Sequence, residues 1–96
     1  MNMMTTPVAN IKVTTKKRTD RTSTVLLQFG DDDPIVAGTL WHSIDGAYWS
    51  VDVAGERVSS RQKFSAVLYL AEAVGAAHFH GSLRYTYGAH SILSCV

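Results

Sequence analysis

The fold is most constrained by the stretch from residue 39 to residue 74, which predicts a two-stranded hairpin followed by one helix. Asp45-Gly46 separates two β-prone runs, and this dipeptide favours a two-residue type I′ turn, because that turn needs positive φ at both positions. Such a turn fixes the register, and directly opposed residues point to the same face of a sheet. The sequence therefore predicts one apolar face and one aromatic and polar face on this hairpin.

The expected apolar face is made of three opposed pairs: Ile44 with Ala47, His42 with Trp49, and Leu40 with Val51. The opposite face is expected to carry the pairs Ser43 with Tyr48, Trp41 with Ser50, and Thr39 with Asp52. Tyr and Trp are enriched at interface hot spots and also stack on bases. We therefore predict a partner-binding site on this second face, formed by Trp41, Tyr48, Ser43, Ser50 and Asp52, to which Tyr85 or Tyr87 could add. The alternative, that the helix covers this face and makes it core, stays open at this point.

The helix is predicted over residues 60–74. Ser59 and Gln62 have the spacing of a capping box, in which each side chain satisfies a backbone N–H at the helix start. An apolar stripe follows at helical spacing, made of Phe64, Val67, Leu68, Leu70, Ala71 and Val74. Gly75 is expected to end the helix in a left-handed conformation.

Alternating residues 8–15 and 24–29 predict two further strands, joined by a basic loop. Residues 30–34 form a turn signal, Gly38 suggests a bulge in the next strand, and residues 54–55 suggest a second turn before a short strand over 56–58. Residues 76–80 fit either helix or strand, whereas residues 83–87 and 90–96 are expected to form two strands joined by a turn. The expected fold is α+β, with an antiparallel sheet of four to six strands packed against one main helix. Residues 1–7 are expected to be a flexible tail and residues 8–96 a single domain.

Composition narrows the class of protein. The 96 residues are 46% hydrophobic and 18% charged, with a net charge of +1, which fits an ordinary globular domain without a global field for nucleic acid or membrane. Cys95 is the single cysteine, so a reducing compartment is expected. No transmembrane run or signal peptide is recognisable, and we expect a cytoplasmic location.

The basic loop contains Lys16, Lys17, Arg18 and Arg21. Four cations at a hairpin tip are suited to contact phosphates or an acidic partner, since each neutralised phosphate releases counterions. The alternative is a solvated turn that keeps a sheet edge soluble.

Chemistry-bearing motifs are weak. His78 and His80 would share a strand face, and His42, His90 or Cys95 would complete a zinc-type ligand set, but no CxxC, HxxxH or HExxH spacing anchors one. No GxSxG elbow and no phosphate-cradling glycine loop is present. We therefore expect no catalytic residues, no metal site, no cofactor and no enzymatic activity.

The stretch from Gly38 to Leu70, a meander followed by a helix, resembles two kinds of protein. One is the three-stranded DNA-binding domain of integrase arms and AP2-type proteins, with Trp49 in the middle strand. The other is the small phage-encoded inhibitors that include anti-CRISPR proteins. The first implies Lys and Arg on the sheet face that enters the groove, and the aromatic face of the predicted hairpin carries none. The second implies a small non-enzymatic protein that docks on a protein partner, such as a phage accessory that inhibits a host defence complex. The alternative is a nucleic-acid-binding module that uses the basic loop over residues 16–21.

Overall fold

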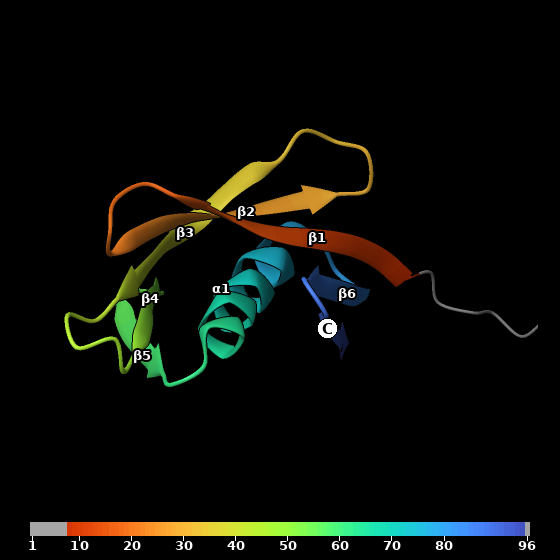
Figure 1. Ribbon diagram of the computed structural model, residues 1–96. Coiled ribbons are helices and arrows are strands. Elements are labelled where there is room, and N and C mark those ends of the chain that lie inside the picture. Colours follow the sequence, from red (N-terminus) through yellow and green to blue (C-terminus); the bar gives the residue numbers. More distant parts are fainter. Residues whose placement is uncertain (1–7, 96) are drawn as a thin grey trace, which may run out of the picture.

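The computed structural model describes residues 8–95, which form seven strands and one helix (Figure 1). In chain order these are β1 (Val8–Lys17), β2 (Thr22–Phe29), β3 (Ile35–His42), β4 (Trp49–Val53), β5 (Glu56–Ser60), α1 (Lys63–His78), β6 (Ser82–Tyr87) and β7 (His90–Cys95). The α+β class with one main helix is confirmed. The expected tail over residues 1–7 lies outside the described residues.

The strands form one sheet in the order β5-β4-β3-β2-β1-β6-β7. Each neighbouring pair is antiparallel except β1 and β6, which run parallel. The expectation of a purely antiparallel sheet of four to six strands is therefore wrong in two details. The physical reason is that α1 carries the chain from the β5 edge to the far side of β1, where β6 joins in parallel and β7 extends the sheet. Figure 1 shows the sheet curled around α1, with β4 and β5 on one side of the helix and β6 on the other.

The core fills the space between α1 and the concave face of the sheet. The fully buried strand residues are the inward members of alternating pairs: Ile11, Val13, Val25, Leu27, Leu40, Val51, Leu83 and Tyr85. They meet the buried helix residues Ala66, Val67, Leu68, Leu70 and Ala71. The predicted helix stripe is thus confirmed, with Phe64 and Val74 packed at its margins.

Both predicted ends of the helix are wrong. Ser59 is not a cap, because β5 continues to Ser60 and the Ser59 hydroxyl lies 2.8 Å from the hydroxyl of Ser50 on β4. The helix begins at Lys63, after Gln62, without a side-chain cap. Gly75 does not end it, since α1 runs on to His78. A glycine is needed at position 75 for another reason: it is buried against the ring of Tyr85.

The predicted register of the central hairpin is confirmed, with Leu40 opposite Val51, Trp41 opposite Ser50 and His42 opposite Trp49. The tip differs from a type I′ turn. Strand pairing stops at His42 and Trp49, and Gly46 alone in the tip has positive φ, at 75°. Ile44, expected on the apolar core face, is 83% exposed because the tip projects beyond the helix.

Three other turn and bulge predictions are confirmed. Residues 30–34 connect β2 to β3, and residues 54–55 connect β4 to β5. The register between β2 and β3 shifts at Val25 and Leu26, opposite Gly38. A Cβ at position 38 would lie 3.1 Å from a methyl carbon of Leu70, so the glycine also allows the helix to approach the sheet.

Candidate functional site

The helix covers the sheet face that carries Leu40 and Val51, which resolves the alternative left open by the sequence. The side chains that alternate with this core point away from α1, and we call the surface they form the outer face. Trp41 and Ser50 lie on it as an opposed pair. The predicted aromatic residue Trp41 is therefore surface, not core, and is half-buried among its neighbours on the sheet.

A cation sits over the Trp41 ring. The Cζ atom of Arg57, on β5, lies 4.5 Å from the ring centroid. The Nε atom of the same side chain donates to Asp52 Oδ1 at 3.1 Å, and Asp52 and Arg57 are directly opposed in the sheet. The two hairpin strands supply no cation to this face, as expected, but the third strand, β5, supplies Arg57.

Hydroxyl groups surround the Trp41 ring. Thr22 on β2 pairs with Trp41, Trp41 pairs with Ser50, and Ser50 pairs with Ser59 on β5. A second row beside it contains Lys16, Thr24 and Thr39. Small polar side chains therefore border the half-buried indole and the guanidinium that lies over it.

The remaining predicted site residues, Ser43 and Tyr48, lie in the hairpin tip. The Ser43 hydroxyl donates to Asp45 Oδ1 at 2.7 Å and accepts from the Tyr48 amide at 2.9 Å. Hydrogen bonds from the Ser43 hydroxyl and the Ala47 amide hold the pKa of Asp45 below its ordinary value. Tyr48 is 41% exposed, with the Arg61 guanidinium 5.9 Å from its ring centroid. Ser43 therefore braces the tip, whereas Tyr48 is available for contact.

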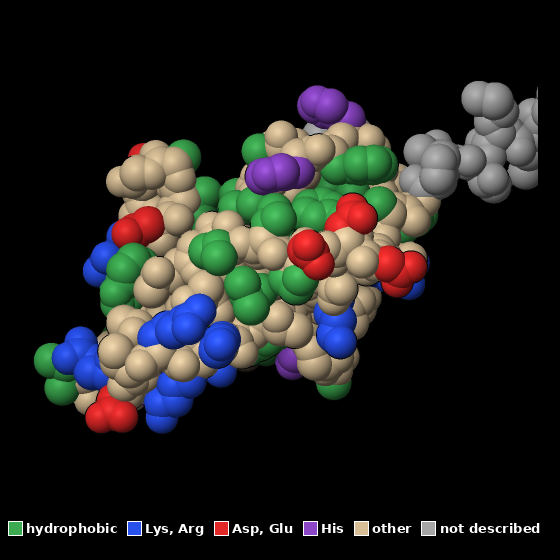
Figure 2. All heavy atoms as spheres, turned by 90° about the horizontal axis from the view of Figure 1, so that it is seen from above, with side chains coloured by type: hydrophobic (Ala, Val, Ile, Leu, Met, Phe, Trp, Pro, Cys, Tyr) green, Lys and Arg blue, Asp and Glu red, His purple; other side chains and the backbone are tan. Residues whose placement is uncertain are grey.

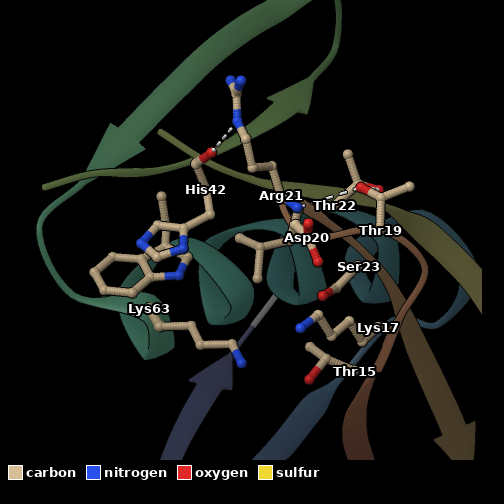
Figure 3. Close-up of a pocket in the computed structure, with 11 residues that line it drawn as sticks. Thr15, Lys17, Thr19, Asp20, Arg21, Thr22, Ser23, His42 and Lys63 are labelled. Carbon is tan, nitrogen blue, oxygen red and sulfur yellow. Dashed lines mark hydrogen bonds between the residues drawn. The ribbon is translucent and has the colours of Figure 1, made fainter. Parts of the chain in front are cut away.

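The structure separates the members of the basic loop. Lys16 and Lys17 are both on β1, so they point to opposite faces: Lys16 pairs with Thr24 on the outer face and Lys17 with Ser23 on the inner side. Arg18 joins the outer face, because its Nε donates to the Thr24 hydroxyl at 2.9 Å. The Arg21 Nε donates to the His42 carbonyl oxygen at 3.3 Å, as the dashed line in Figure 3 shows. The four predicted cations do not form one cluster.

Charge is nevertheless concentrated on the outer face. Within residues 8–95 its strands carry four cationic side chains, namely Lys12, Lys16, Arg57 and Arg84, to which Arg18 adds a fifth. Asp52 is the one carboxylate on these outward strand positions, and it is already paired with Arg57. Figure 2 shows the Lys and Arg side chains gathered mainly toward the left, the side on which Figure 1 places β4 and β5. The net charge of +1 therefore conceals an uneven distribution of charge.

Two residues suggested as additions to the aromatic face lie elsewhere. Tyr85 is fully buried beneath α1, and Tyr87 points to the inner side, where its hydroxyl lies 3.3 Å from that of Thr15.

The histidines are dispersed: His42 stacks on Trp49, with centroids 4.5 Å apart, and His90 stacks on Phe64 at 3.8 Å. No three His, Cys, Asp or Glu side chains of the described segment are placed to hold a metal ion.

The binding residues predicted from the sequence did not include Arg57, Lys12 and Arg84 on the outer face, or Arg61 beside Tyr48. A usable signal for Arg57 existed, because a two-residue turn at residues 54–55 places Arg57 opposite Asp52. Lys12 and Arg84 each stand between two buried residues on their strands, so alternation alone assigns them to the outer face.

No protein-family model, curated protein or solved structure matches this chain. Among the described residues, α1 is the one helix, and it is neither long nor apolar enough to cross a membrane. Fold and site together define an α+β domain whose curled sheet presents a cationic outer face with a half-buried indole under a guanidinium.

Proposed function

We propose that this chain is a non-enzymatic binding protein that holds single-stranded nucleic acid on the outer face of its sheet. The observation that carries the proposal is the placement of Trp41 under Arg57 on a face whose outward strand positions carry four cations and one carboxylate. Aromatic side chains in a cationic surface are the usual means of binding single strands, because bases stack on the rings while cations contact the phosphates. The sequence suggested nucleic-acid binding through the basic loop over residues 16–21 as the alternative function. The surface proposed here is instead the outer face of the sheet.

The geometry around Trp41 supports this partner in a further respect. The neighbouring side chains Thr22, Ser50 and Ser59 are small and carry hydroxyl groups, which hydrogen-bond to phosphate and sugar oxygens. Lys16 and Arg18 lie on the β1 side of the ring and the Arg57 guanidinium lies over it, so a strand that crosses from β1 toward β5 would meet cations before the indole and at it.

The test uses a fluorescently labelled single-stranded oligonucleotide and anisotropy at fixed salt. Stacking on one aromatic side chain contributes about 1–3 kcal/mol, so Trp41→Ala should weaken binding by about fivefold to a hundredfold. Tyr69→Ala is the matched control, since Tyr69 is 49% exposed but lies on α1, away from the outer face. Unchanged affinity in a folded Trp41→Ala variant would contradict the proposal.

A second candidate function, docking on a protein partner, is favoured by the hairpin tip. Ile44 is 83% exposed and Tyr48 is 41% exposed, and exposed apolar and aromatic side chains on a projecting loop are suited to a pocket on another protein. An inhibitor of a host defence complex, as the sequence resemblance implies, would use these residues. An Ile44→Ser, Tyr48→Ser double variant should then lose a partner, identified by mass spectrometry, that the unmodified chain captures from nuclease-treated lysate. Retention of that partner by the variant would exclude the tip as the docking element.

A further inference from the structure

A polar pocket lies on the inner side of the sheet, below the connection between β1 and β2. It has a volume of about 300 Å³, and its lining comes from β1, β2, β3 and β4, the 18–21 connection and the first residue of α1. The pocket faces the inner side, because Lys17 and Ser23 line it while their neighbours Lys16 and Thr24 point the opposite way, and Thr22 is the one lining residue shared with the outer face.

Two ammonium groups enter this pocket from different elements. Lys17 is the last residue of β1 and Lys63 is the first residue of α1. Figure 3 shows both side chains directed into the same space, whereas the Arg21 guanidinium points away toward the His42 carbonyl. Like charges that converge in a recess repel one another, and an anion between them removes that repulsion.

A neutral hydrogen-bond donor stands beside one of the two cations. The hydroxyl of Ser23 lies next to Lys17 in Figure 3, and Ser23 lines the pocket, whereas the Thr15 hydroxyl in the lining is already within 3.3 Å of the Tyr87 hydroxyl. Lys63 also lies at the N-terminal end of α1, which has no side-chain cap and no acidic residue in its first turn. The positive end of the helix dipole is therefore left without a negative partner from the first turn of its own helix.

One wall is rigid and aromatic. The rings of His42 and Trp49 line the pocket and stack with their planes within 8° of each other. The His42 Nε2 atom donates to the Gly46 carbonyl oxygen at 3.3 Å, which fixes the ring. Asp20 also lines the pocket, but among residues 8–95 the one side-chain ion pair joins Arg57 to Asp52, so no ion pair neutralises Lys17 or Lys63.

We infer that this pocket binds a phosphate group, as inorganic phosphate or as a phosphomonoester. Two ammonium groups and the Ser23 hydroxyl match the several acceptor oxygens of a phosphate better than the two oxygens of a carboxylate, and the two ammonium groups outnumber the one carboxylate of the lining, that of Asp20. The volume of about 300 Å³ accommodates a phosphate group together with part of the body of a phosphomonoester. This site is independent of the proposed nucleic-acid surface, and either can be wrong without the other.

The test uses a Trp41→Phe background, in which Trp49 in the pocket wall is the remaining tryptophan and reports on the pocket by fluorescence. Inorganic phosphate is titrated at constant ionic strength, with chloride as the balancing anion. A saturable change is expected, and Lys17→Gln and Lys63→Gln should each weaken it at least about tenfold, as loss of one charged hydrogen-bond donor does. Lys16→Gln is the matched control, because it removes the same charge one residue away on the other face, and should change the affinity less than twofold.

Absence of a saturable change would overturn the inference, and so would an equal loss of affinity in Lys16→Gln and Lys17→Gln. Both lysines are exposed, so the variants are expected to fold, and unchanged melting temperatures verify this. A 5′-phosphorylated and a 5′-hydroxyl oligonucleotide separate the two sources of the group. Preference for the phosphorylated form that vanishes in Lys17→Gln assigns the pocket to a nucleic-acid terminus; phosphate binding without that preference assigns it to a free phosphate compound.

Discussion

Tyr85 lies against the backbone of Gly75, so closely that a Cβ at position 75 would come within 2.9 Å of two carbons of its ring. Tyr85 is fully buried on β6, the strand that joins β1 in parallel. Contact between this ring and α1 therefore ties the helix to the C-terminal part of the sheet. Glycine inside a helix is ordinarily unfavourable, and here the absence of a side chain is what allows the contact.

Gly75→Ala is predicted to destabilise the fold. In an unobstructed helix this change stabilises by about 1 kcal/mol, because alanine has the higher helix propensity. Overpacking against Tyr85 reverses the sign, and we expect a net loss of about 1–3 kcal/mol in the free energy of unfolding, measured by urea denaturation. Addition of Tyr85→Phe should restore part of the loss, because the phenol oxygen makes the closest approach. A higher urea midpoint for Gly75→Ala would show that the ring moves aside without strain.

The pH dependence of stability is predicted to carry a contribution from the same tyrosine. Burial raises the pKa of Tyr85, and the nearby carboxylate of Glu72 adds a smaller increase. A raised folded-state pKa means that the folded chain holds the proton more tightly than the unfolded chain, whose tyrosines titrate at about pH 10. The stabilising contribution is therefore complete below about pH 10 and is lost as the pH rises through the folded-state pKa.

Tyr85→Phe keeps the ring and removes this titration. We expect its stability to decline less steeply than that of the unmodified chain when urea midpoints are compared from neutral pH to about pH 11. Tyr69→Phe, at an exposed position on α1, serves as the control and should follow the unmodified chain. If the urea midpoints of all three proteins declined in parallel, Tyr85 would not be the source of the loss of stability at alkaline pH.

The β4–β5 turn offers a stabilising substitution. Ala54 has a φ of 51° and is followed by Gly55 with a φ of 83°. A left-handed conformation is unfavourable for alanine, whereas asparagine tolerates it and Asn-Gly is a preferred pair in such turns. Ala54→Asn should raise the free energy of unfolding by about 0.5–1 kcal/mol. Ala54→Val should lower it, because a β-branched residue is still less compatible with positive φ, and thermal unfolding of both variants gives the comparison.

These turns also explain how much of the fold the sequence could predict. Asp45-Gly46 specified the register of β3 and β4, and Leu40 faces Val51 as expected even though the tip is wider than a type I′ turn. The register is the expected one because the flanking strands alternate strongly. The connection between His42 and Trp49 also has the same number of residues as in the predicted hairpin. The position of β6 was not predictable, because a parallel pairing with β1 joins residues some 70 positions apart and leaves no local turn signal.

The start of the helix and the charge of the outer face were not predicted from the sequence, for a related reason. Ser59 satisfies the pattern of a cap and also that of a strand residue, and its pairing opposite Ser50 decided between them. Trp41 and its face were predicted correctly, but the charge of that face was not. Arg57 reaches the Trp41 ring from two strands away, and pairwise register between neighbours does not reveal such a contact.

Because Lys16 and Lys17 point to opposite faces of the sheet, they are predicted to contribute differently to the salt dependence of nucleic-acid binding. If nucleic acid binds the outer face, each cation that contacts a phosphate contributes to the slope of log affinity against log salt concentration. Lys16→Gln should lower the magnitude of that slope by about 1, and Lys17→Gln should leave it nearly unchanged. Both variants have the same net charge and differ by one position, so the comparison separates specific phosphate contact from general electrostatic attraction.

Arg84→Gln and Lys63→Gln extend the comparison across the molecule. Arg84 is on the outer face of β6, and Lys63 is on the inner side at the start of α1. If the nucleic acid spans the sheet from β5 to β6, Arg84→Gln should lower the magnitude of the slope of log affinity against log salt concentration. If it is confined to the region of Trp41, Arg84→Gln should leave that slope unchanged. In either case Lys63→Gln should behave like Lys17→Gln. Equal slopes for all four variants would mean that the outer face makes no direct phosphate contact, and the exposed hairpin tip would then be the better candidate for the binding element.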